Sequence, residues 1–315
     1  MRFAIMGSGG VGGYFGARLA EAGEDVVFIA RGDHLAAMRS EGLRLTSLAG
    51  DVTIAPVHAT DDPAEVGVVD AVIVAVKAWQ LREAAAAMRP LVGPNTVVLP
   101  LENGVEAADT LAEVLGEAPV IDGLCAIVAW RQAPGHIHHA AVDPVVRLGE
   151  RDNRPSARVA RLEAAFAGAR GVRADVPDDI RAAVWSKFLF ICAMSGIGGI
   201  TRAPIGVTRQ LAETRAVIEQ LVAEIEAVAR ARGVALADDA ARRTMDFIDA
   251  MPAASTASMQ RDILAGRPSE LEAQNGAVVR LGREAGVATP FNRLVHAALL
   301  PQERAARGEP PAVGS

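Results

Sequence analysis

The fold of this chain is decided by the stretch RFAIMGSGGVG, residues 2–12. An apolar run typical of a buried strand leads directly into the spacing G-x-G-x-x-G. In a dinucleotide-binding βα unit, the first glycine permits a tight turn and the second lets a pyrophosphate approach the backbone. The third brings the helix close to the strand, and the helix N-terminus faces the negative charge. The predicted cofactor-binding residues of this turn are Gly7, Ser8, Gly9, Gly10, Val11 and Gly12. The alternative is an ordinary glycine-rich turn.

Strand and helix patterns alternate along the first half of the chain. The strand candidates are Arg2–Met6, Asp25–Ala30, Ala71–Val76 and Thr96–Pro100. The helix candidates are Gly12–Ala22, Leu35–Ser40, Gln80–Met88 and Glu106–Leu115. Apolar strands that alternate with helices predict a parallel sheet covered on both faces. A strand-rich stretch at Val120–Glu150, with a turn at Ala133–Gly135, follows these elements.

The second half of the chain shows only helical patterns. One helix runs from Asp178 through Lys187, another covers Glu213–Arg232, and Ser269 and Glu272 form a capping-box pattern for a helix that reaches Glu284. We therefore expect an α/β Rossmann-type parallel sheet domain followed by an all-α helical domain. Residues 1–177 would form an NADP-binding domain, residues 178–300 a helical substrate and catalytic domain, and residues 301–315 a flexible tail.

Arg31 follows the second predicted strand and indicates which cofactor the turn binds. An acidic residue at this point would hydrogen-bond the ribose 2′-hydroxyl of NAD(H), whereas an arginine can receive the 2′-phosphate of NADP(H). Asp33, two residues later, keeps NAD(H) open as the alternative. We predict NADP(H) as the cofactor.

The basic residues are unevenly divided, because 30 of the 32 are arginine and only Lys77 and Lys187 are lysine. A guanidinium stays charged at ordinary pH, whereas an ammonium among apolar neighbours can give up its proton. Lys77 and Asn103 follow predicted strands, at the sheet edge where ligands bind. Lys187 stands beside Trp185 in an apolar helix, where it could protonate an oxygen that gains charge. Codon bias and a lysine that extends into solvent are the ordinary alternatives.

Together these motifs resemble the ketopantoate reductases, also called 2-dehydropantoate 2-reductases. The resemblance extends to about Pro301 and rests on the glycine turn with Arg31 and on the segments that carry Lys77 and Asn103. It also rests on Ile180-Arg181-x-x-x-Trp185-x-Lys187, Ser258-Met259-x-x-Asp262, and Glu270 with Asn275-Gly276. It implies NADPH-dependent reduction of a 2-oxo acid in pantothenate biosynthesis. By resemblance, Lys187 is the general acid and Glu270 binds cofactor or substrate and orders the lysine. Ser258 would hold the substrate carboxylate, while Lys77 and Asn103 would line the site.

The chain departs from the family pattern at three substrate positions. Ile191 and Ser195 stand where the family usually has asparagines, on the helix face of Lys187, and Ser255 replaces another asparagine. An apolar Ile191 removes a donor for the hydroxyl of ketopantoate, and sites that bind a hydroxyl discriminate strongly. A different, less polar 2-oxo acid is therefore our hypothesis for the substrate.

Composition limits the other functional classes. A net charge of −6 gives no basic surface for nucleic acid, no apolar run looks long enough to cross a bilayer, and no signal peptide is seen. We expect a cytoplasmic protein that binds a small 2-oxo acid, without nucleic-acid or membrane partners, and a homodimer stays open. Cys125 and Cys192 lack ligand spacing, and His136-x-His138-His139 lacks accompanying acids, so no metal is predicted. The rival functions are a non-catalytic NADP(H)-binding sensor and an NAD-linked 2-hydroxy-acid dehydrogenase.

Overall fold

The computed structural model describes residues 1–309 of the chain. It divides into two compact units: unit 1 comprises residues 1–102 and 107–180, and unit 2 comprises residues 103–106 and those from 181 onward. The division falls after residue 180, three residues beyond the expected boundary. That the short segment 103–106 belongs to unit 2 was not predicted from the sequence.

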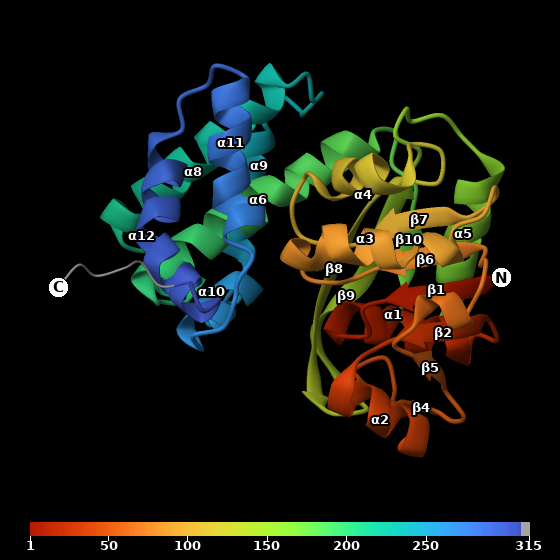
Figure 1. Ribbon diagram of the computed structural model, residues 1–315. Helices are drawn as coiled ribbons and strands as arrows, with labels where there is room; N and C mark the ends of the chain where they lie inside the picture. The colour runs from red at the N-terminus through yellow and green to blue at the C-terminus, as the bar shows by residue number, and fades with distance from the viewer. Residues whose placement is uncertain (310–315) are drawn as a thin grey trace. The chain divides into compact units, whose positions relative to one another are not determined.

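Unit 1 is built on a five-stranded parallel sheet in the order β5-β2-β1-β6-β7 (Figure 1). The strands are β1 (Arg2–Met6), β2 (Asp25–Ile29), β5 (His58–Thr60), β6 (Ala71–Val74) and β7 (Val97–Pro100). The chain proceeds outward from β1 to β5 and then returns to β6, on the other side of β1. This reversal lies at the carboxyl ends of β1 and β6, where open α/β sheets bind their ligands. The predicted parallel Rossmann-type sheet is confirmed.

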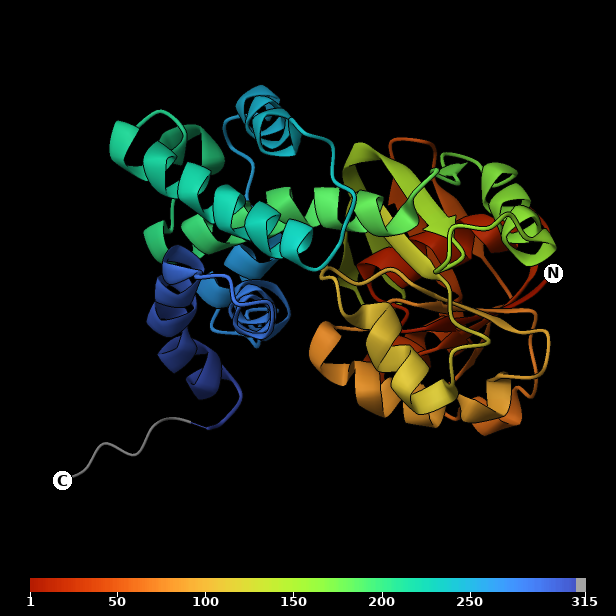
Figure 2. The same ribbon diagram turned by 90° about the horizontal axis from the view of Figure 1, so that it is seen from above.

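Helices cover this sheet on both faces, as the apolar strands predict. They are α1 (Gly10–Glu21), α2 (Gly32–Glu41), α3 (Leu81–Ala87) and α4 (Ala107–Leu115). Another helix, α5 (Ala157–Ala167), contacts residues 136–149 and 173–175 of a second sheet. Figure 2 shows α3 and α4 together on one face. Along β1, Ala4 and Met6 belong to the hydrophobic cluster on that face, whereas Phe3 and Ile5 belong to the cluster that contains α1. This alternation follows from the two-residue period of a strand.

A second, mixed sheet packs against the other side of α1. Its strands are β3 (Leu43–Ser47), β4 (Val52–Ile54), β8 (Asp122–Ala133), β9 (His136–Gly149) and β10 (Arg173–Asp175). β8 and β9 form the hairpin expected around the turn at 133–135. β3, β4 and β5 were not predicted, because each has only three to five residues. In addition, β3 pairs with β9 and β5 pairs with β2, both distant in sequence, whereas β4 pairs with its neighbour β3.

All regular elements in the described part of unit 2 are helical (Figure 1). They are α6 (Ile180–Thr201), α7 (Ile205–Thr208), α8 (Ala212–Ala231), α9 (Ala240–Ala250), α10 (Ser258–Leu264), a π-helix (Glu272–Gly276), α11 (Ala277–Glu284) and α12 (Pro290–Ala306). Their apolar side chains form one cluster that includes Phe188, Leu221 and Val295. The all-α prediction for this part of the chain is confirmed.

One expectation about apolar runs was wrong. The 22 residues of α6 are long and apolar enough to cross a membrane by length and composition. Within the apolar window, 61% of the residues are buried inside the protein, as in the core helix of a soluble domain.

At the end of unit 2, one expectation was wrong and another was right only in part. α12 continues through Pro301 to Ala306, so residues 301–306 are not a tail, and only residues 310–315 lie outside the described part. The predicted helix does reach Glu284, and the Ser269 hydroxyl accepts from the backbone N–H of Leu271 at 3.3 Å. The capping box is nevertheless incomplete, because that hydroxyl donates to Glu303 and the carboxylate of Glu272 lies 2.8 Å from Nε2 of His296. Glu303 and His296 both belong to α12, which was not predicted.

Candidate active site

The glycine-rich turn of unit 1 has the geometry that its sequence predicts. Gly7 has a φ of +96°, a backbone angle that residues with a side chain rarely adopt, so the turn needs glycine there. A Cβ on Gly12 would lie 2.1 Å from the carbonyl oxygen of Gly7, so helix and strand approach too closely for any other residue. A Cβ on Gly9, in contrast, would meet no atom within 4 Å. The backbone at Gly9 is therefore open to a phosphate at the N-terminus of α1.

The remaining residues of the turn connect it to the rest of unit 1. The Ser8 hydroxyl donates to the carbonyl of Ile29 at 3.0 Å, so the turn is tied to the end of β2. Gly10 and Val11 begin α1, and a Cβ on Gly10 would lie 2.3 Å from the carbonyl oxygen of Ala129. β8 therefore also requires a glycine in this turn, a constraint that the dinucleotide motif alone does not explain.

Arg31 and Asp33 are both exposed and both paired. The guanidinium of Arg31 lies 3.3 Å from the carboxylate of Glu83 on α3, and both side chains are more than 60% exposed. Asp33 pairs instead with Arg131 on β8, also at 3.3 Å. An exposed ion pair contributes little stability, so Arg31 can exchange Glu83 for a phosphate at small cost.

Lys77 lies at the same carboxyl edge of the sheet as the glycine turn. It follows β6 and precedes the short 3₁₀ helix Ala78–Gln80, and its ammonium lies 5.7 Å from the centre of the Trp79 ring. A Cβ on Gly7 would lie 2.9 Å from the carbonyl oxygen of Ala75, two residues before Lys77. The glycine turn and the backbone just before Lys77 are therefore neighbours in unit 1.

Unit 2 brings together three of the predicted residues. The Lys187 ammonium on α6 donates to Oδ1 of Asn103 at 2.9 Å. The amide nitrogen of Asn103 lies 3.5 Å from Oε2 of Glu270, which is 5% exposed. Asn103 thus accepts from a cation and donates toward an anion, so its amide orientation is fixed. The segment 103–106 belongs to unit 2 through such contacts, including the ion pair between Glu106 and Arg280.

Other predicted residues of unit 2 lie on the same elements. Ile191 and Ser195 follow Lys187 by four and eight residues on α6, with Ile191 half-buried and Ser195 fully buried. The Ser195 hydroxyl has no hydrogen-bond partner among the described residues. Ser258 is the first residue of α10, and Ser255 lies just before it. Both are half-buried, and no described contact joins either one to Lys187.

A buried amide that was not predicted lies close to Glu270, since the backbone N–H of Gln274 donates to the Glu270 carbonyl at 3.0 Å. Gln274 is fully buried, and neither atom of its amide has a hydrogen-bond partner among the described residues. It lies in the π-helix Glu272–Gly276, a distortion that occurs often at functional sites. No sequence pattern distinguishes Gln274 from the core residues around it.

The three histidines of β9 contact hydroxyl groups of the neighbouring strand β3. His136 and His138 both approach the Thr46 hydroxyl, at 3.1 and 2.8 Å, whereas His139 approaches Ser47 at 2.9 Å. His136 and His138, two residues apart on the strand, therefore share a face. Among residues 1–309, no three acidic, histidine or cysteine side chains are grouped as a metal site would require.

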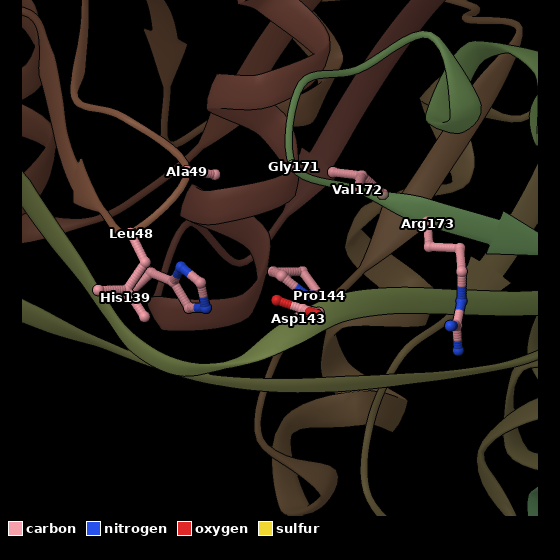
Figure 3. Close-up of a pocket in the computed structure, with 8 residues that line it drawn as sticks. All are labelled: Leu48, Ala49, His139, Asp143, Pro144, Gly171, Val172 and Arg173. Atoms are coloured by element: carbon pink, nitrogen blue, oxygen red, sulfur yellow. The ribbon is translucent and has the colours of Figure 1, made fainter.

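A separate hollow of about 360 Å³ lies beside the second sheet of unit 1 (Figure 3). It is lined by Leu48, Ala49, His139, Asp143, Pro144, Gly171, Val172 and Arg173. In Figure 3, Leu48 and the His139 ring lie on one side and Arg173 on the other. None of the predicted site residues lines this hollow.

Two family models match the two parts of the chain. The model described as Ketopantoate reductase PanE/ApbA matches residues 3–153, and that of its C-terminal domain matches residues 179–303. The uncharacterized oxidoreductase YkpB of Bacillus subtilis is 30% identical over 301 residues, covering 95% of this chain and 98% of its own. A 2-dehydropantoate 2-reductase of Nostoc is 31% identical, covering 94% and 93%.

Solved structures agree with these matches. A PanE/ApbA family ketopantoate reductase from Ralstonia eutropha superposes with a TM-score of 0.88 at 36% identity, covering 98% of this chain and all of that one. A D-mandelate dehydrogenase solved with NADH and anilino(oxo)acetate shares the fold, with a TM-score of 0.88 at 23% identity. The chain is thus an oxidoreductase with a Rossmann-type and a helical domain. It belongs to the ketopantoate reductase family.

Proposed function

We propose that this protein uses NADPH to reduce a 2-oxo acid, 2-dehydropantoate or a related acid, to the 2-hydroxy acid. The observation that carries the proposal is the group formed by Lys187, Asn103 and Glu270 in unit 2. It holds a proton donor in a fixed orientation beside a buried carboxylate. A cofactor at the glycine turn would supply the hydride that reduces the substrate carbon.

Each residue of the group has a distinct part in this reaction. As hydride reaches C2 of the substrate, the ketone oxygen gains negative charge and takes a proton from the Lys187 ammonium. The resulting Lys187 amine then takes a proton from water. Asn103 keeps the amine in place by accepting from it. Glu270 holds the Asn103 amide and would bind a donor group of cofactor or substrate. Ser258, at the start of α10, would bind the substrate carboxylate.

Arg31 supports NADPH rather than NADH as the reductant. Its guanidinium is exposed after β2 and is held by an exposed ion pair with Glu83, which a phosphate can replace. An arginine at this point suits a 2′-phosphate. We expect the Michaelis constant for NADPH to lie far below that for NADH, and equal use of the two would contradict this assignment.

The α6 face favours a less polar substrate than ketopantoate. Ile191 presents no donor to a substrate hydroxyl, and the buried Ser195 and half-buried Ser255 offer shorter side chains than asparagine. Comparing ketopantoate with acids such as 2-oxoisovalerate tests this directly. A strong preference for ketopantoate would contradict the hypothesis.

The decisive experiment is a screen of 2-oxo acids, with NADPH oxidation followed by absorbance at saturating cofactor. Oxidation with at least one acid, lost in Lys187→Ala, is the expected result. Binding of NADPH without oxidation by any acid would instead favour the sensor function. Faster turnover of a 2-hydroxy acid with NAD⁺ would favour an oxidative dehydrogenase.

A further inference from the structure

His34 connects the glycine turn to the β8–β9 hairpin and belongs to none of the sequence motifs described above. It lies in α2 and is 4% exposed. Its Nε2 lies 2.8 Å from the carbonyl oxygen of Ser8, and its Nδ1 accepts from the backbone N–H of Gly135 at 2.9 Å. Both ring nitrogens are therefore bonded to backbone atoms of other segments.

These two contacts determine the tautomer of the ring. The backbone N–H of Gly135 can only donate, so Nδ1 carries no hydrogen and Nε2 must carry one and donate to Ser8. Burial lowers the pKa of His34 and favours this neutral form. Among the neighbouring charges, Arg131 lowers the pKa further, while the Ser8 bond and Asp33 raise it.

The bond to Ser8 fixes one peptide plane of the turn. In a trans peptide the C=O and the following N–H point in opposite directions. Holding the Ser8 carbonyl toward His34 therefore turns the Gly9 N–H away from it. Gly9 is also the residue whose missing side chain leaves open space, and backbone N–H groups at a helix N-terminus are the usual donors to phosphate.

We propose that His34 is a positioning residue for the cofactor, because it holds the Ser8–Gly9 peptide with its N–H directed at the pyrophosphate. The inference rests on the proposed function, since it requires a dinucleotide at the glycine turn. His34 does not itself need to touch the cofactor. Its role is to fix the orientation of the Gly9 N–H before the cofactor binds, so that less conformational entropy is lost on binding.

Two variants separate the two bonds of the ring. In His34→Gln the longer amide can place its nitrogen near the position of Nε2 and keep the donation to Ser8. In His34→Asn the shorter amide can place its oxygen near Nδ1, keeping the bond from Gly135 but losing that to Ser8. We expect His34→Gln to bind NADPH within about threefold of the wild type and His34→Asn to bind about tenfold more weakly. Turnover at saturating NADPH should change little in either variant.

The matched controls are His58→Gln and His58→Asn, because His58 is an exposed histidine in the same unit. These should bind NADPH as the wild type does. Equal losses in the two His34 variants, or full affinity in His34→Asn, would overturn the inference. If the wild type does not bind NADPH, or if Gly9→Val binds it normally, the proposed function itself fails.

A measurement on the wild type covers the case in which a His34 variant does not fold. NMR of ¹⁵N-histidine protein at neutral pH should show His34 protonated at Nε2 and not at Nδ1. The opposite tautomer would leave Ser8 without its donor and would refute the proposal.

Discussion

Lys187 carries the most direct prediction about a single side chain. Replacing it with alanine removes the proposed proton donor, so kcat should fall about 10²-fold or more. NADPH affinity should stay nearly unchanged, as measured by fluorescence titration. Lys187→Arg is the matched control, since it keeps the positive charge but holds its proton too firmly to donate it. If the arginine variant turned over like the wild type, the role of general acid would be wrong.

Substitutions of Arg31 and of Glu83 should change the preference for NADPH over NADH in opposite directions. Arg31→Ala should narrow the preference for NADPH over NADH, because the 2′-phosphate loses its partner. Glu83→Gln should widen it, because the exposed carboxylate that now pairs with Arg31 would no longer repel the phosphate. Michaelis constants for both cofactors test this, and a shift in the same direction for both variants would count against it.

At the scale of elements, Glu150 joins the end of β9 to the start of α5. Its carboxylate accepts from Arg158 and from Ser156, the N-cap of α5, each at 2.6 Å. Arg158, aided by Ser156 and opposed by burial, lowers the pKa of Glu150 below its ordinary value of 4.5. The stabilisation is therefore complete above about pH 4.5 and is lost as the pH falls through the lower, folded pKa.

The expected measurement is the free energy of unfolding of the wild type and of Glu150→Gln, determined with denaturant between pH 3 and 7. The difference between them should be constant above about pH 5 and should shrink as the pH falls below 4.5. A difference that grew on acidification would show that the sign is wrong.

Glu303 gives a prediction about α12. Its carboxylate is 3% exposed and accepts from the backbone N–H of Ser269, at 3.0 and 3.1 Å, and from the Ser269 hydroxyl at 2.5 Å. It also pairs with Arg307 at 2.6 Å. Glu303→Ala would leave these donors without an acceptor and should lower the free energy of unfolding by about 2–4 kcal/mol. The exposed neighbour Gln302→Ala should change it by less than about 0.5 kcal/mol.

For the molecule as a whole, the two units have separate hydrophobic clusters, centred on the strands in unit 1 and on α6 in unit 2. We therefore expect calorimetry to resolve two unfolding transitions. Gly12→Ala should lower only one of them, because its Cβ would lie 2.1 Å from the Gly7 carbonyl oxygen inside unit 1. A single transition that moves as a whole would contradict this.

The sequence was sufficient to predict the parallel sheet and the glycine turn, because both follow from local patterns such as the apolar strands and the spacing of Gly7, Gly9 and Gly12. Lys187 and Asn103 were predicted separately, because they are 84 positions apart in the sequence. Their contact could not be read from spacing. His34 was missed because both of its partners are backbone groups of distant segments, and Glu303 because its bonds to Ser269 span 34 positions, so no sequence motif marks either residue.

Because residues 103–106 belong to unit 2, hybrids between two members of this family are restricted in where they can be joined. The chain passes between the units at residues 102, 106 and 180, so one crossover cannot exchange a complete unit. A hybrid joined at residue 180 would combine the Asn103 of one parent with the Lys187 of the other. Such a hybrid keeps the bond only where the parent that supplies residues 1–180 has an amide at position 103, so a four-residue loop limits which parents can be combined.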